Sequence, residues 1–249
     1  MNKFKLTIIT VVKNDEKNIE KTIKSVINQK DVKFEYIIID GGSTDNTIKI
    51  LSKYKKSIKK IISKKDKGIY DAMNKGIKFA NNDIVVFCNS GDFFYKNSLK
   101  KVIKIFNNKD VDFVFGTVVR NYTKGTIVKY GFNSKRIFFN FDFATAHSTG
   151  FFLKKKIYKK IGLYNLKFRC SADYDLYLRL IKKNYKGSST NKVDLIGNVA
   201  SGGFSSKISF FSHLIEETKI RLNNNQNLFI IILVFFNSLV KNLFKKFTI

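Results

Sequence analysis

A carboxylate followed by two glycines belongs to the first of four polar clusters whose residue types could bind a ligand or move a proton. Asp40 precedes Gly41 and Gly42, and Asp45 follows closely. Glycines let the backbone turn sharply, and Asp45 can cap a following helix. Asp40 is expected at the rim of a sheet, where its carboxylate could accept hydrogen bonds from a base N–H or a ribose hydroxyl. The glycines taken alone predict only a tight turn.

The second cluster, residues 66–76, has the sequence DKGIYDAMNKG. Asp71 and Asn74 are three residues apart, so on a helix that begins near Gly68 they project from one face near its N-terminus. Backbone N–H groups at that end favour anions, which predicts a place for a phosphate or a sugar hydroxyl. Any one of these residues alone would fit a capped surface helix, but that alternative explains the whole string poorly.

The third cluster, Asn89 to Asp92, directly follows an apolar run. A pair of carboxylates here would hold a divalent cation against a diphosphate, because hard cations take oxygen ligands. Asp92 is the only carboxylate, with Asn89 as a further oxygen donor, so the sequence contains half of such a site. The alternative for Asp92 is a loop residue or a helix cap.

The fourth cluster places Asp173 and Asp175 at the start of a predicted helix. Residues two apart cannot share a helix face, so at most one points into a site while the other caps the helix or meets solvent. A carboxylate here could act as a general base that takes a proton from an acceptor hydroxyl. Taken alone, it is more typical of a helix cap.

Alternating strands and helices along the first 120 residues must position these clusters. Apolar β-branched runs predict strands, and apolar residues at helical spacing predict helices. Strands are expected at residues 6–12, 34–39, 58–62, 84–88 and 113–118, and helices at residues 45–54, 69–80 and 98–106, with another after residues 14 and 15. This alternation predicts an α/β fold with a mostly parallel, Rossmann-like sheet covered by helices on both faces. Ligands bind beyond the carboxyl ends of such strands, where residues 13–15, 40–44 and 89–92 fall.

After about residue 120 the alternation loosens. Short strands are expected at residues 126–130 and 149–153, and helices at residues 172–183 and 208–222. We expect this half to elaborate the sheet and not to form an independent domain.

The C-terminal segment, residues 226–249, combines an apolar run with lysines. The run Leu228 to Val240 is about thirteen residues long, short of the ~20 that span a bilayer as a helix. Its phenylalanines and the lysines after it are typical of an amphipathic helix that lies in the interface of an anionic membrane. A core helix that closes the fold and an oligomer contact are the alternatives.

The charge of the chain suggests an anionic partner. The formal net charge is +28, from 47 Lys and Arg against 19 Asp and Glu. Nucleic acid, an anionic membrane or a phosphorylated substrate would suit such a charge. Over-use of Lys, Asn, Ile and Phe without Pro or Trp is also what A+T-biased coding produces. The lysines are spread over the whole chain, so no specific nucleic acid is expected.

Cysteine content and the N-terminal run bear on the compartment. Cys88 and Cys170 have no paired spacing, which argues against a zinc site or a disulfide framework and favours a reducing compartment. The apolar run at residues 6–12 is too short for a signal peptide. We expect a cytoplasmic protein, peripheral on the cytosolic face of the inner membrane if the C-terminal helix binds lipid.

Five strings in a fixed order carry a resemblance to a known family. They are TIITVVKN at residues 7–14, EYIIIDGGSTDNT at 35–47, DKGIYDAMNKGI at 66–77, CNSGD at 88–92 and SADYDLYLRL at 171–180. Together they resemble the family 2 glycosyltransferases of the GT-A fold, particularly bacterial enzymes of surface polysaccharide synthesis similar to the colanic acid glycosyltransferases. The likeness spans most of residues 5–205.

The resemblance implies one GT-A domain over residues 1–225. Donor binding would occupy residues 1–120, and acceptor binding with catalysis residues 121–225. Asp173 matches the catalytic Asp of the family, and His147 matches a segment on the acceptor side. The implied contacts to the nucleotide sugar come from Thr10, Val12, Asn14, Asp40, Gly41, Asp66, Gly68, Asp71 and Asn74.

The metal-binding D-x-D of the family matches the string Asn89 to Asp92, which implies a Mg²⁺ or Mn²⁺ ion held by Asp92, with Asn89 as a second ligand. Asn89 and Gly91 stand where the family often has acidic residues, so metal dependence is less secure than the fold. Ala172 stands where many relatives have Glu, which removes a neighbour that could shift the pKa of the base.

The activity implied is inverting transfer of a sugar from a nucleotide sugar, expected to be UDP-linked, to a saccharide or polyprenyl-phosphate-linked acceptor, in surface polysaccharide synthesis of the cell envelope. Two other functions stay open on the residues alone. A nucleotidyltransferase that makes sugar nucleotides usually has a Gly-rich loop after its first strand, whereas Lys13 to Asp15 contain no glycine. A basic nucleic-acid-binding module would concentrate basic and aromatic residues in one motif.

Overall fold

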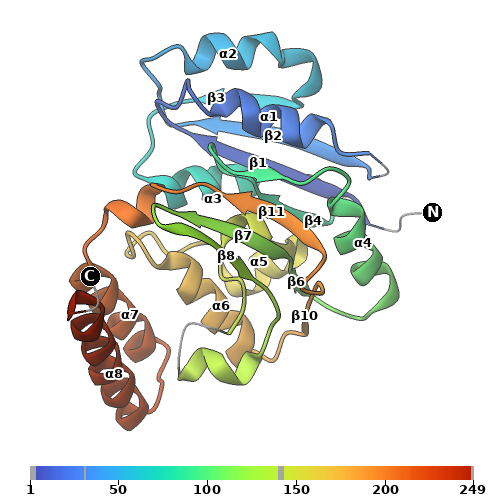
Figure 1. The fold of residues 1–249 in the computed structure, drawn as a ribbon. Coiled ribbons are helices and arrows are strands. Elements are labelled where there is room, and N and C mark those ends of the chain that lie inside the picture. Colours follow the sequence, from blue (N-terminus) through green and yellow to red (C-terminus); the bar gives the residue numbers. More distant parts are fainter. Residues whose placement is uncertain (1–3, 31, 140–142, 248–249) are drawn as a thin grey trace.

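Two β-sheets with helices packed on them form the structure, a computed structural model that describes residues 4–30, 32–139 and 143–247 (Figure 1). The larger sheet has seven strands in the order β10-β6-β9-β4-β1-β2-β3, and the smaller has four in the order β5-β11-β7-β8. The strands of the larger sheet are β1 (Leu6–Val12), β2 (Phe34–Asp40), β3 (Lys60–Ser63), β4 (Ile84–Phe87), β6 (Phe113–Phe115), β9 (Phe151–Lys154) and β10 (Gly187–Ser189). Those of the smaller sheet are β5 (Phe93–Phe94), β7 (Thr117–Tyr122), β8 (Gly125–Lys129) and β11 (Leu195–Val199).

Helices cover both faces of the larger sheet, as predicted. Every residue of β1 is buried, and its side chains alternate between two apolar clusters, Ile8 in one and Ile9 in the other. A strand buried on both faces reads as a continuous apolar run, which explains the sequence of β1. One face carries α1 (Ile19–Ile27), α2 (Thr47–Lys53) and α4 (Leu99–Asn108), and the other carries α3 (Ile69–Phe79), α5 (Lys155–Ile161) and α6 (Ala172–Lys182).

Short 3₁₀ helices connect several of these elements. They are η1 (Lys55–Ser57), η2 (Ser134–Phe138), η3 (Ser148–Gly150) and η4 (Phe204–Lys207). The last of them, η4, precedes the C-terminal helices.

The prediction of a single strand at residues 113–118 is wrong, because the chain changes sheets at Gly116. β6 ends at Phe115 in the larger sheet, and β7 begins at Thr117 in the smaller one. A Cβ on Gly116 would lie 2.7 Å from Cγ1 of Ile196 on β11, so only glycine leaves room for the Ile196 side chain here. After this crossing β7 pairs with β11, which in turn pairs with β5, the strand that follows the loop after β4.

The strand expected at residues 149–153 begins at Phe151, after η3, and its direction departs from the parallel alternation. β9 pairs antiparallel with β4 on one side and with β6 on the other. The pairs β4–β1, β1–β2 and β2–β3 are all parallel. The sheet is therefore mostly parallel, as predicted, with one inserted antiparallel strand.

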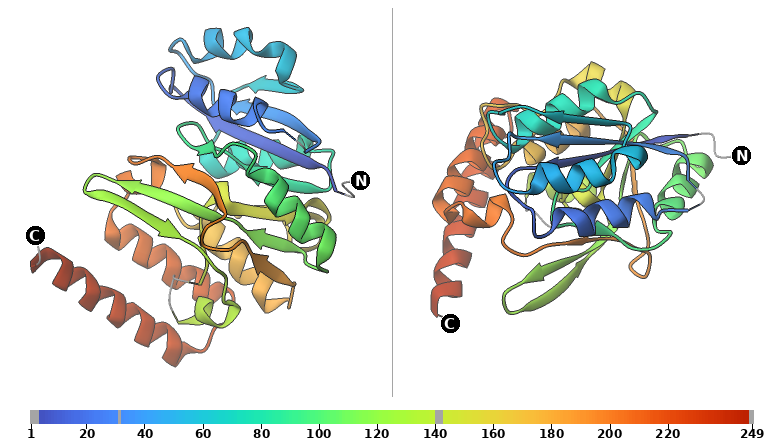
Figure 2. Two further views of the ribbon diagram at one scale, coloured as in Figure 1. Left: turned by 45° about the vertical axis from the view of Figure 1, so that its right-hand side comes forward. Right: turned by 90° about the horizontal axis from the view of Figure 1, so that it is seen from above.

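Two C-terminal helices lie side by side at one end of the molecule (Figures 1 and 2). They are α7 (Phe210–Asn223) and α8 (Leu228–Phe247), and they contact each other along the hairpin. At 20 residues, α8 is longer than the apolar run at residues 228–240 that the sequence marks. Within the described residues, none of the helices combines the length and apolarity needed to cross a membrane.

Candidate active site

The polar loops at residues 13–15, 40–44 and 89–92 meet at the carboxyl edge of the larger sheet. Val12, the last residue of β1, lies opposite Asp40 at the end of β2. Its carbonyl accepts a hydrogen bond from the Gly41 N–H at 2.9 Å, and the Val11 carbonyl accepts one from the Ser90 N–H at 3.1 Å. The loops after β1, β2 and β4 are thus joined through their backbones, which confirms that these polar loops lie together.

The carboxylate of Asp40 accepts most of its hydrogen bonds from its own loop. Its Oδ2 accepts hydrogen bonds from the N–H groups of Gly42 and Ser43, both at 3.0 Å, and from the Ser63 hydroxyl at 2.6 Å. Its Oδ1 accepts one from the Ser43 hydroxyl, and the residue is fully buried. In this structure Asp40 therefore shapes the loop, and its side chain is not exposed for the predicted direct contact with a base or ribose.

Asp66, unlike the fully buried Asp40, has part of its side chain at the surface of this edge. A Cβ on Gly41 would lie 2.3 Å from Oδ2 of Asp66, so the glycine lets this carboxylate rest against the backbone after β2. Oδ1 of Asp66 accepts a hydrogen bond from the Gly68 N–H at 2.9 Å. Its Oδ2 has no hydrogen-bond partner within the described part of the chain, and the residue is half-buried. Asp66 is therefore the carboxylate of this edge that is available to a ligand.

Asn14 links the first two loops and remains exposed. Its backbone lies in the left-handed region with φ 49°, which Asn adopts more readily than most residues. Its N–H donates to the Ser43 hydroxyl at 2.8 Å, and its Oδ1 accepts from the Thr44 N–H at 2.8 Å. The side-chain amide nitrogen remains at the surface of the edge.

Thr10 and Val12 contribute to the interior of β1. The Thr10 hydroxyl donates to the Cys88 carbonyl at 2.7 Å and lies 2.9 Å from the Tyr36 hydroxyl, with no exposed surface. Val12 is 6% exposed, and its carbonyl is bonded to Gly41. Both side chains are therefore core residues, and the donor contacts that the resemblance implies at Thr10 and Val12 stay a prediction for the main chain around them.

The second cluster opens α3, as predicted, but two of its polar side chains are engaged. Gly68 precedes the helix with φ 121°, a conformation that favours glycine. Asp71 accepts from the Lys67 N–H at 3.0 Å and pairs with Lys75 at 3.0 Å. Asn74 is 7% exposed and bonds both backbone groups of Tyr164, at 2.9 and 3.0 Å. The predicted ligand contact of Asn74 is thus replaced by a tie to the segment before α6.

Asp92 is buried beside two residues of the second half of the chain. Its Oδ2 accepts from the Thr149 hydroxyl at 2.6 Å, and its Oδ1 accepts from the Ala200 N–H at 3.0 Å. Burial raises the pKa of Asp92 to about 6, although the hydrogen bond from Thr149 opposes the rise. Nδ1 of His147 lies 3.9 Å from Oδ2.

A divalent cation would find a small set of hard ligands here. Asn89 donates its amide N–H to the Ser148 hydroxyl at 3.1 Å, while its Oδ1 is buried without a hydrogen-bond partner. An unsatisfied buried carbonyl oxygen is costly and is a suitable cation ligand. The described residues contain no group of three or more His, Cys, Asp or Glu that could hold a metal. Mg²⁺ often uses one or two protein ligands together with substrate phosphates, so Asn89 and Asp92 fit such an ion.

His147 is neutral at physiological pH. Burial lowers its pKa to about 3, and the nearby Arg120 guanidinium adds to the effect. Its Nδ1 accepts a hydrogen bond from the Thr149 N–H at 3.3 Å, which leaves the proton on Nε2. The side chain retains 22% exposure, so Nε2 can donate to a ligand.

Asp173 is half-buried at the second position of α6. Its Oδ1 accepts from the Tyr174 N–H at 2.8 Å and lies 3.2 Å from the Tyr70 hydroxyl, which shares its proton with the Cys170 carbonyl. Burial raises the pKa of this carboxyl group. A partly exposed carboxylate with an elevated pKa suits a general base.

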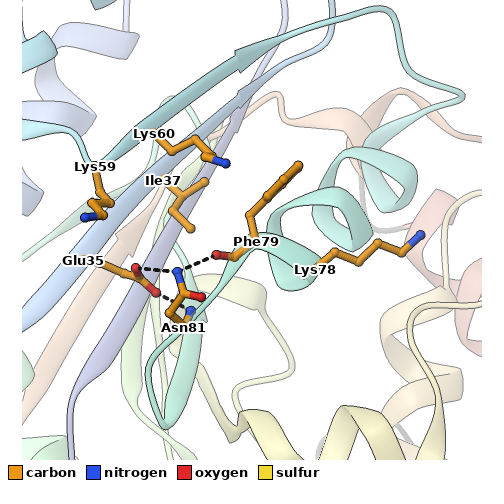
Figure 3. Close-up of a pocket in the computed structure, with 7 residues that line it drawn as sticks. All are labelled: Glu35, Ile37, Lys59, Lys60, Lys78, Phe79 and Asn81. Atoms are coloured by element: carbon orange, nitrogen blue, oxygen red, sulfur yellow. Dashed lines mark hydrogen bonds between the residues drawn. The ribbon is translucent and has the colours of Figure 1, made fainter.

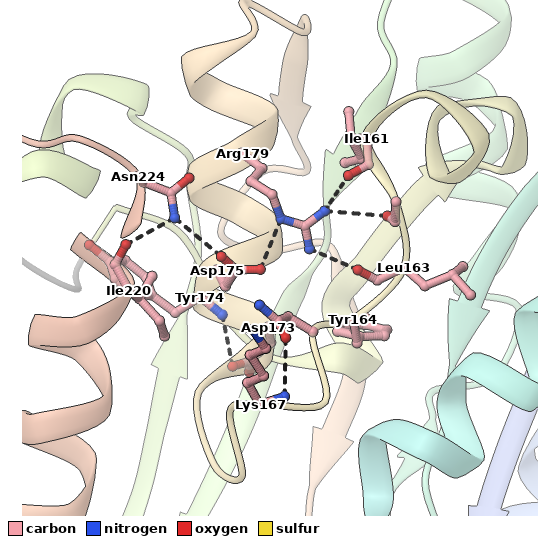
Figure 4. Close-up of polar contacts among 12 residues, drawn as sticks. Ile161, Leu163, Tyr164, Lys167, Asp173, Tyr174, Asp175, Arg179, Ile220 and Asn224 are labelled. Carbon is pink, nitrogen blue, oxygen red and sulfur yellow. Dashed lines mark hydrogen bonds and ion pairs between the residues drawn. The ribbon is translucent and has the colours of Figure 1, made fainter. Parts of the chain in front are cut away.

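Asp175 points away from Asp173, as the spacing predicts, but it neither caps a helix nor meets solvent (Figure 4). It is 3% exposed, and Oδ2 pairs with Nε of Arg179 at 2.8 Å. Arg179 in turn donates to the carbonyls of residues 161–163 at the end of α5. Asp175 therefore helps to hold α6 against α5, because a guanidinium between carbonyl groups needs a counter-charge.

Arg120 is a site residue that sequence reasoning missed. It lies half-buried on β7, where its charge opposes the burial that raises the pKa values of Asp92 and Asp173 and adds to the burial that lowers the pKa of His147. The structure shows no hydrogen bond or ion pair from its guanidinium to any described residue. One signal in the sequence could have found it: the chain has only five arginines among its many lysines, and Arg is retained where a planar, multidentate cation is needed.

Two pockets lie outside this group. The first, of about 160 Å³, lies beside the amino ends of β2 and β3 (Figure 3). Glu35 there is bonded to Asn81, and the three lysine side chains point in different directions, so they do not form an anion site. The second, of about 370 Å³, is lined by the bonded Asp175 and Arg179. Neither pocket contains Asp92 or Asp173.

Comparison with known proteins gives a consistent result. The model of the family described as "Glycosyl transferase family 2" matches residues 7–167. A PGL/p-HBAD biosynthesis glycosyltransferase of Mycobacterium bovis is 29% identical over 164 residues, which cover 63% of this chain and 62% of the relative. The chain thus spans about three fifths of that relative's length.

Solved structures share the fold. S. aureus TarS matches with a TM-score of 0.71 at 18% identity, over 90% of this chain and 40% of that chain. TarS 1–349 in complex with UDP-GlcNAc matches with a TM-score of 0.70 at 18% identity, over 90% of this chain and 68% of that chain. These likenesses confirm the predicted GT-A type of α/β fold.

Proposed function

The chain belongs to glycosyl transferase family 2, and on that basis we propose that it transfers a sugar from a nucleoside-diphosphate sugar to an acceptor hydroxyl. The observation that carries this proposal is Asp173, a half-buried carboxyl group with a raised pKa that Arg120 connects electrostatically to the loop after β4. Group transfer needs a base for the acceptor and positive charge near the leaving group. Asp173 would supply the base, and Arg120, between Asp173 and the loop after β4, would supply the charge. Family membership also argues against the nucleotidyltransferase and nucleic-acid-binding alternatives.

The donor would bind at the edge formed by the loops after β1, β2 and β3. Oδ2 of Asp66 and the exposed amide of Asn14 are available there to accept from and donate to a nucleoside. Solved structures of TarS with UDP and with UDP-GlcNAc support a UDP-linked donor.

The diphosphate would lie between Arg120 and the Asn89 to Asp92 loop. The Asn89 amide oxygen is buried without a donor, and the partly exposed Arg120 guanidinium has no ion-pair partner among the described residues. A diphosphate with a cation would bind both groups together. Mg²⁺ or Mn²⁺ held by Asn89 and Asp92 would neutralise charge on the leaving diphosphate.

Asp173 would act on the acceptor. Its carboxylate takes the proton of the acceptor hydroxyl, whose oxygen bonds to the anomeric carbon as the bond from that carbon to the phosphate oxygen breaks. The nucleoside diphosphate leaves with the bonding electrons, and the single displacement inverts the anomeric configuration. His147 would donate from Nε2 to the acceptor. A retained configuration in the product would refute this mechanism.

The acceptor would be a saccharide or a polyprenyl-phosphate-linked sugar used in surface polysaccharide synthesis. A lipid-linked acceptor lies at a membrane, and α8 carries large apolar side chains on the face that no other described element covers, including Phe229 and Phe236 at 73% and 59% exposure. These exposed rings support a peripheral position on the cytosolic face of the inner membrane.

Thermal unfolding with a panel of UDP-GlcNAc, UDP-glucose, UDP-galactose and GDP-mannose tests the function. A donor at 100 times its Kd stabilises the chain by about 2.7 kcal/mol, which corresponds to roughly 5–10 °C in Tm. We expect at least one UDP sugar to produce this shift, more with Mg²⁺ than with EDTA. Asp66→Asn should reduce the shift, and Asn89→Ala should remove its Mg²⁺-dependent part. No shift with any nucleotide sugar would overturn the proposal.

A further inference from the structure

The helix α7 buries apolar and polar side chains together: Leu214, Ile220 and Arg221 are 4%, 0% and 2% exposed. Its exposed side carries Phe211, Ile215 and Leu222, which are 57%, 49% and 49% exposed. Three of its polar side chains, those of Glu216, His213 and Arg221, face the segment that contains Asp173. Helices usually bury their apolar stripe, and buried polar groups cost stability unless they are bonded. The polar face of α7 therefore needs a reason beyond packing.

Glu216, in the middle of that face, binds the turn that leads into α6. Its Oε1 accepts a hydrogen bond from the Arg169 N–H at 2.6 Å. Its Oε2 accepts from the N–H groups of Cys170 and Ser171 at 2.9 and 3.1 Å, and from the Cys170 thiol at 3.0 Å. Burial would raise the pKa of Glu216, but these hydrogen bonds lower it, so the group is a carboxylate.

Other residues of α7 hold the same segment on either side of Asp173. Nδ1 of His213 lies 3.5 Å from the Ser171 hydroxyl, and the guanidinium of Arg221 lies 5.2 Å from the Tyr174 ring centre. Asn224, just after the helix, donates to Oδ1 of Asp175 at 3.2 Å. The structure records no hydrogen bond between α7 and the Asp173 carboxylate, so the helix fixes the main chain around the base and leaves its oxygens to the ligand side.

We propose that Glu216 is a positioning residue for the general base, holding the 169–171 turn so that Asp173 enters α6 in the orientation that reaches the acceptor hydroxyl. Three successive backbone N–H groups converge on one carboxylate that belongs to a different helix. The Glu216 side chain thereby sets the position of Asp173, two residues after Ser171. This inference rests on the assignment of Asp173 as the base.

Glu216→Gln tests the role, because the amide keeps the size of the side chain and loses an acceptor oxygen and the charge. A shift of about 1 Å in a catalytic group can cost on the order of 10²-fold in rate. We expect kcat for nucleotide release from the nucleotide sugar selected by the unfolding panel to fall by about that factor. The KM for the donor and the donor-induced shift in Tm should stay within about twofold of the wild-type values.

Lys219→Gln, on the exposed side of the same helix, is the matched control and should leave kcat unchanged. Glu216→Asp keeps the charge but is one methylene shorter, and it should also lower kcat selectively; it decides the question if the glutamine variant does not fold. A merely structural role would lower Tm and weaken donor binding together with kcat. Folded variants with wild-type kcat, or with kcat and donor affinity reduced equally, would overturn the proposal.

Asp173→Asn, measured in parallel, separates the two ideas. Loss of turnover in Asp173→Asn with full turnover in Glu216→Gln would refute the positioning role and leave the base assignment intact. Full turnover in Asp173→Asn would instead refute the base itself.

Discussion

Asp40 and Asp173 are both carboxylates of the predicted site, yet their surroundings give them opposite roles. Asp40 accepts four hydrogen bonds from its own loop and from Ser63 and has no exposed surface, so a ligand in this structure cannot reach its oxygens. Asp173 is half-buried, and its Oδ2 has no hydrogen bond to a described residue. A carboxylate acts on a ligand only with the oxygens that the protein leaves unbonded.

Replacing Asp173 with Asn should remove the base and little else. General-base catalysis contributes about 10²–10⁴-fold, so kcat should fall by that factor while donor affinity is retained. Since burial raises the pKa of Asp173, wild-type activity should rise with pH as this carboxyl group loses its proton and then level off, and the variant should lack this rise. Steady-state kinetics across the pH range measures both effects. An unchanged pH profile in the variant would contradict the assignment.

At the scale of elements, α8 has two distinct apolar faces. Ile231 and Val234 are buried, at 3% and 5% exposure, while Phe229, Phe236 and Val240 on the opposite side are 73%, 59% and 47% exposed. The apolar residues of this outer face recur at helical spacing along α8. The helix contains lysines and no acidic residue. A helix with an uncovered apolar face and only positive charge suits an anionic lipid surface.

The double variant Phe229→Gln, Phe236→Gln should lose this binding. Each inserted phenylalanine contributes about 1.5–3 kcal/mol, so removing two should weaken association at least about 10²-fold. Pelleting with phosphatidylglycerol vesicles, and with neutral phosphatidylcholine vesicles for comparison, measures the effect. Ile127→Gln, at a residue of β8 that is 50% exposed, is the matched control and should bind as the wild type does. Equal recovery of the double variant would show that α8 is not the contact.

At the scale of the whole molecule, the two sheets meet where the chain crosses from β6 to β7. This crossing places Arg120, from the smaller sheet, within electrostatic reach of Asp92 after β4 and of Asp173 on α6. Asp92 and Asp173 thus share one nearby positive charge. A single charged side chain thereby acts on carboxylates of two different elements, which the sequence order does not suggest.

Arg120→Ala should therefore weaken donor binding more than its distance from the nucleoside loops would suggest. Charge-assisted hydrogen bonds contribute about 1.5–3 kcal/mol, which predicts an affinity roughly 10–10²-fold lower. Isothermal titration with the selected UDP sugar measures it. Lys124→Ala, on the exposed β7–β8 turn, removes the same charge from the same hairpin and should bind normally. If Arg120→Ala bound the UDP sugar with wild-type affinity, Arg120 would be excluded as a ligand of the diphosphate.

The sequence by itself determined the parallel core and the place of the site. Continuous β-branched runs can be satisfied only by strands buried on both faces, and the polar strings after them must then lie at one edge. Periodicity therefore predicted β1, β2, β4 and the helices between them, together with the grouping of Asn14, Asp40 and Asp92. The place of Asp66 beside them was implied only by the family resemblance.

Only the tertiary structure decided which of these residues are free to act. Whether Asp40 or Asn74 meets a ligand depends on partners such as Ser63 and Tyr164, which are distant in sequence and which no local pattern reveals. The change of sheet at Gly116 and the resulting position of Arg120 depend on the close approach of Ile196. Local sequence sets the direction of side chains within an element, whereas long-range packing sets what they touch.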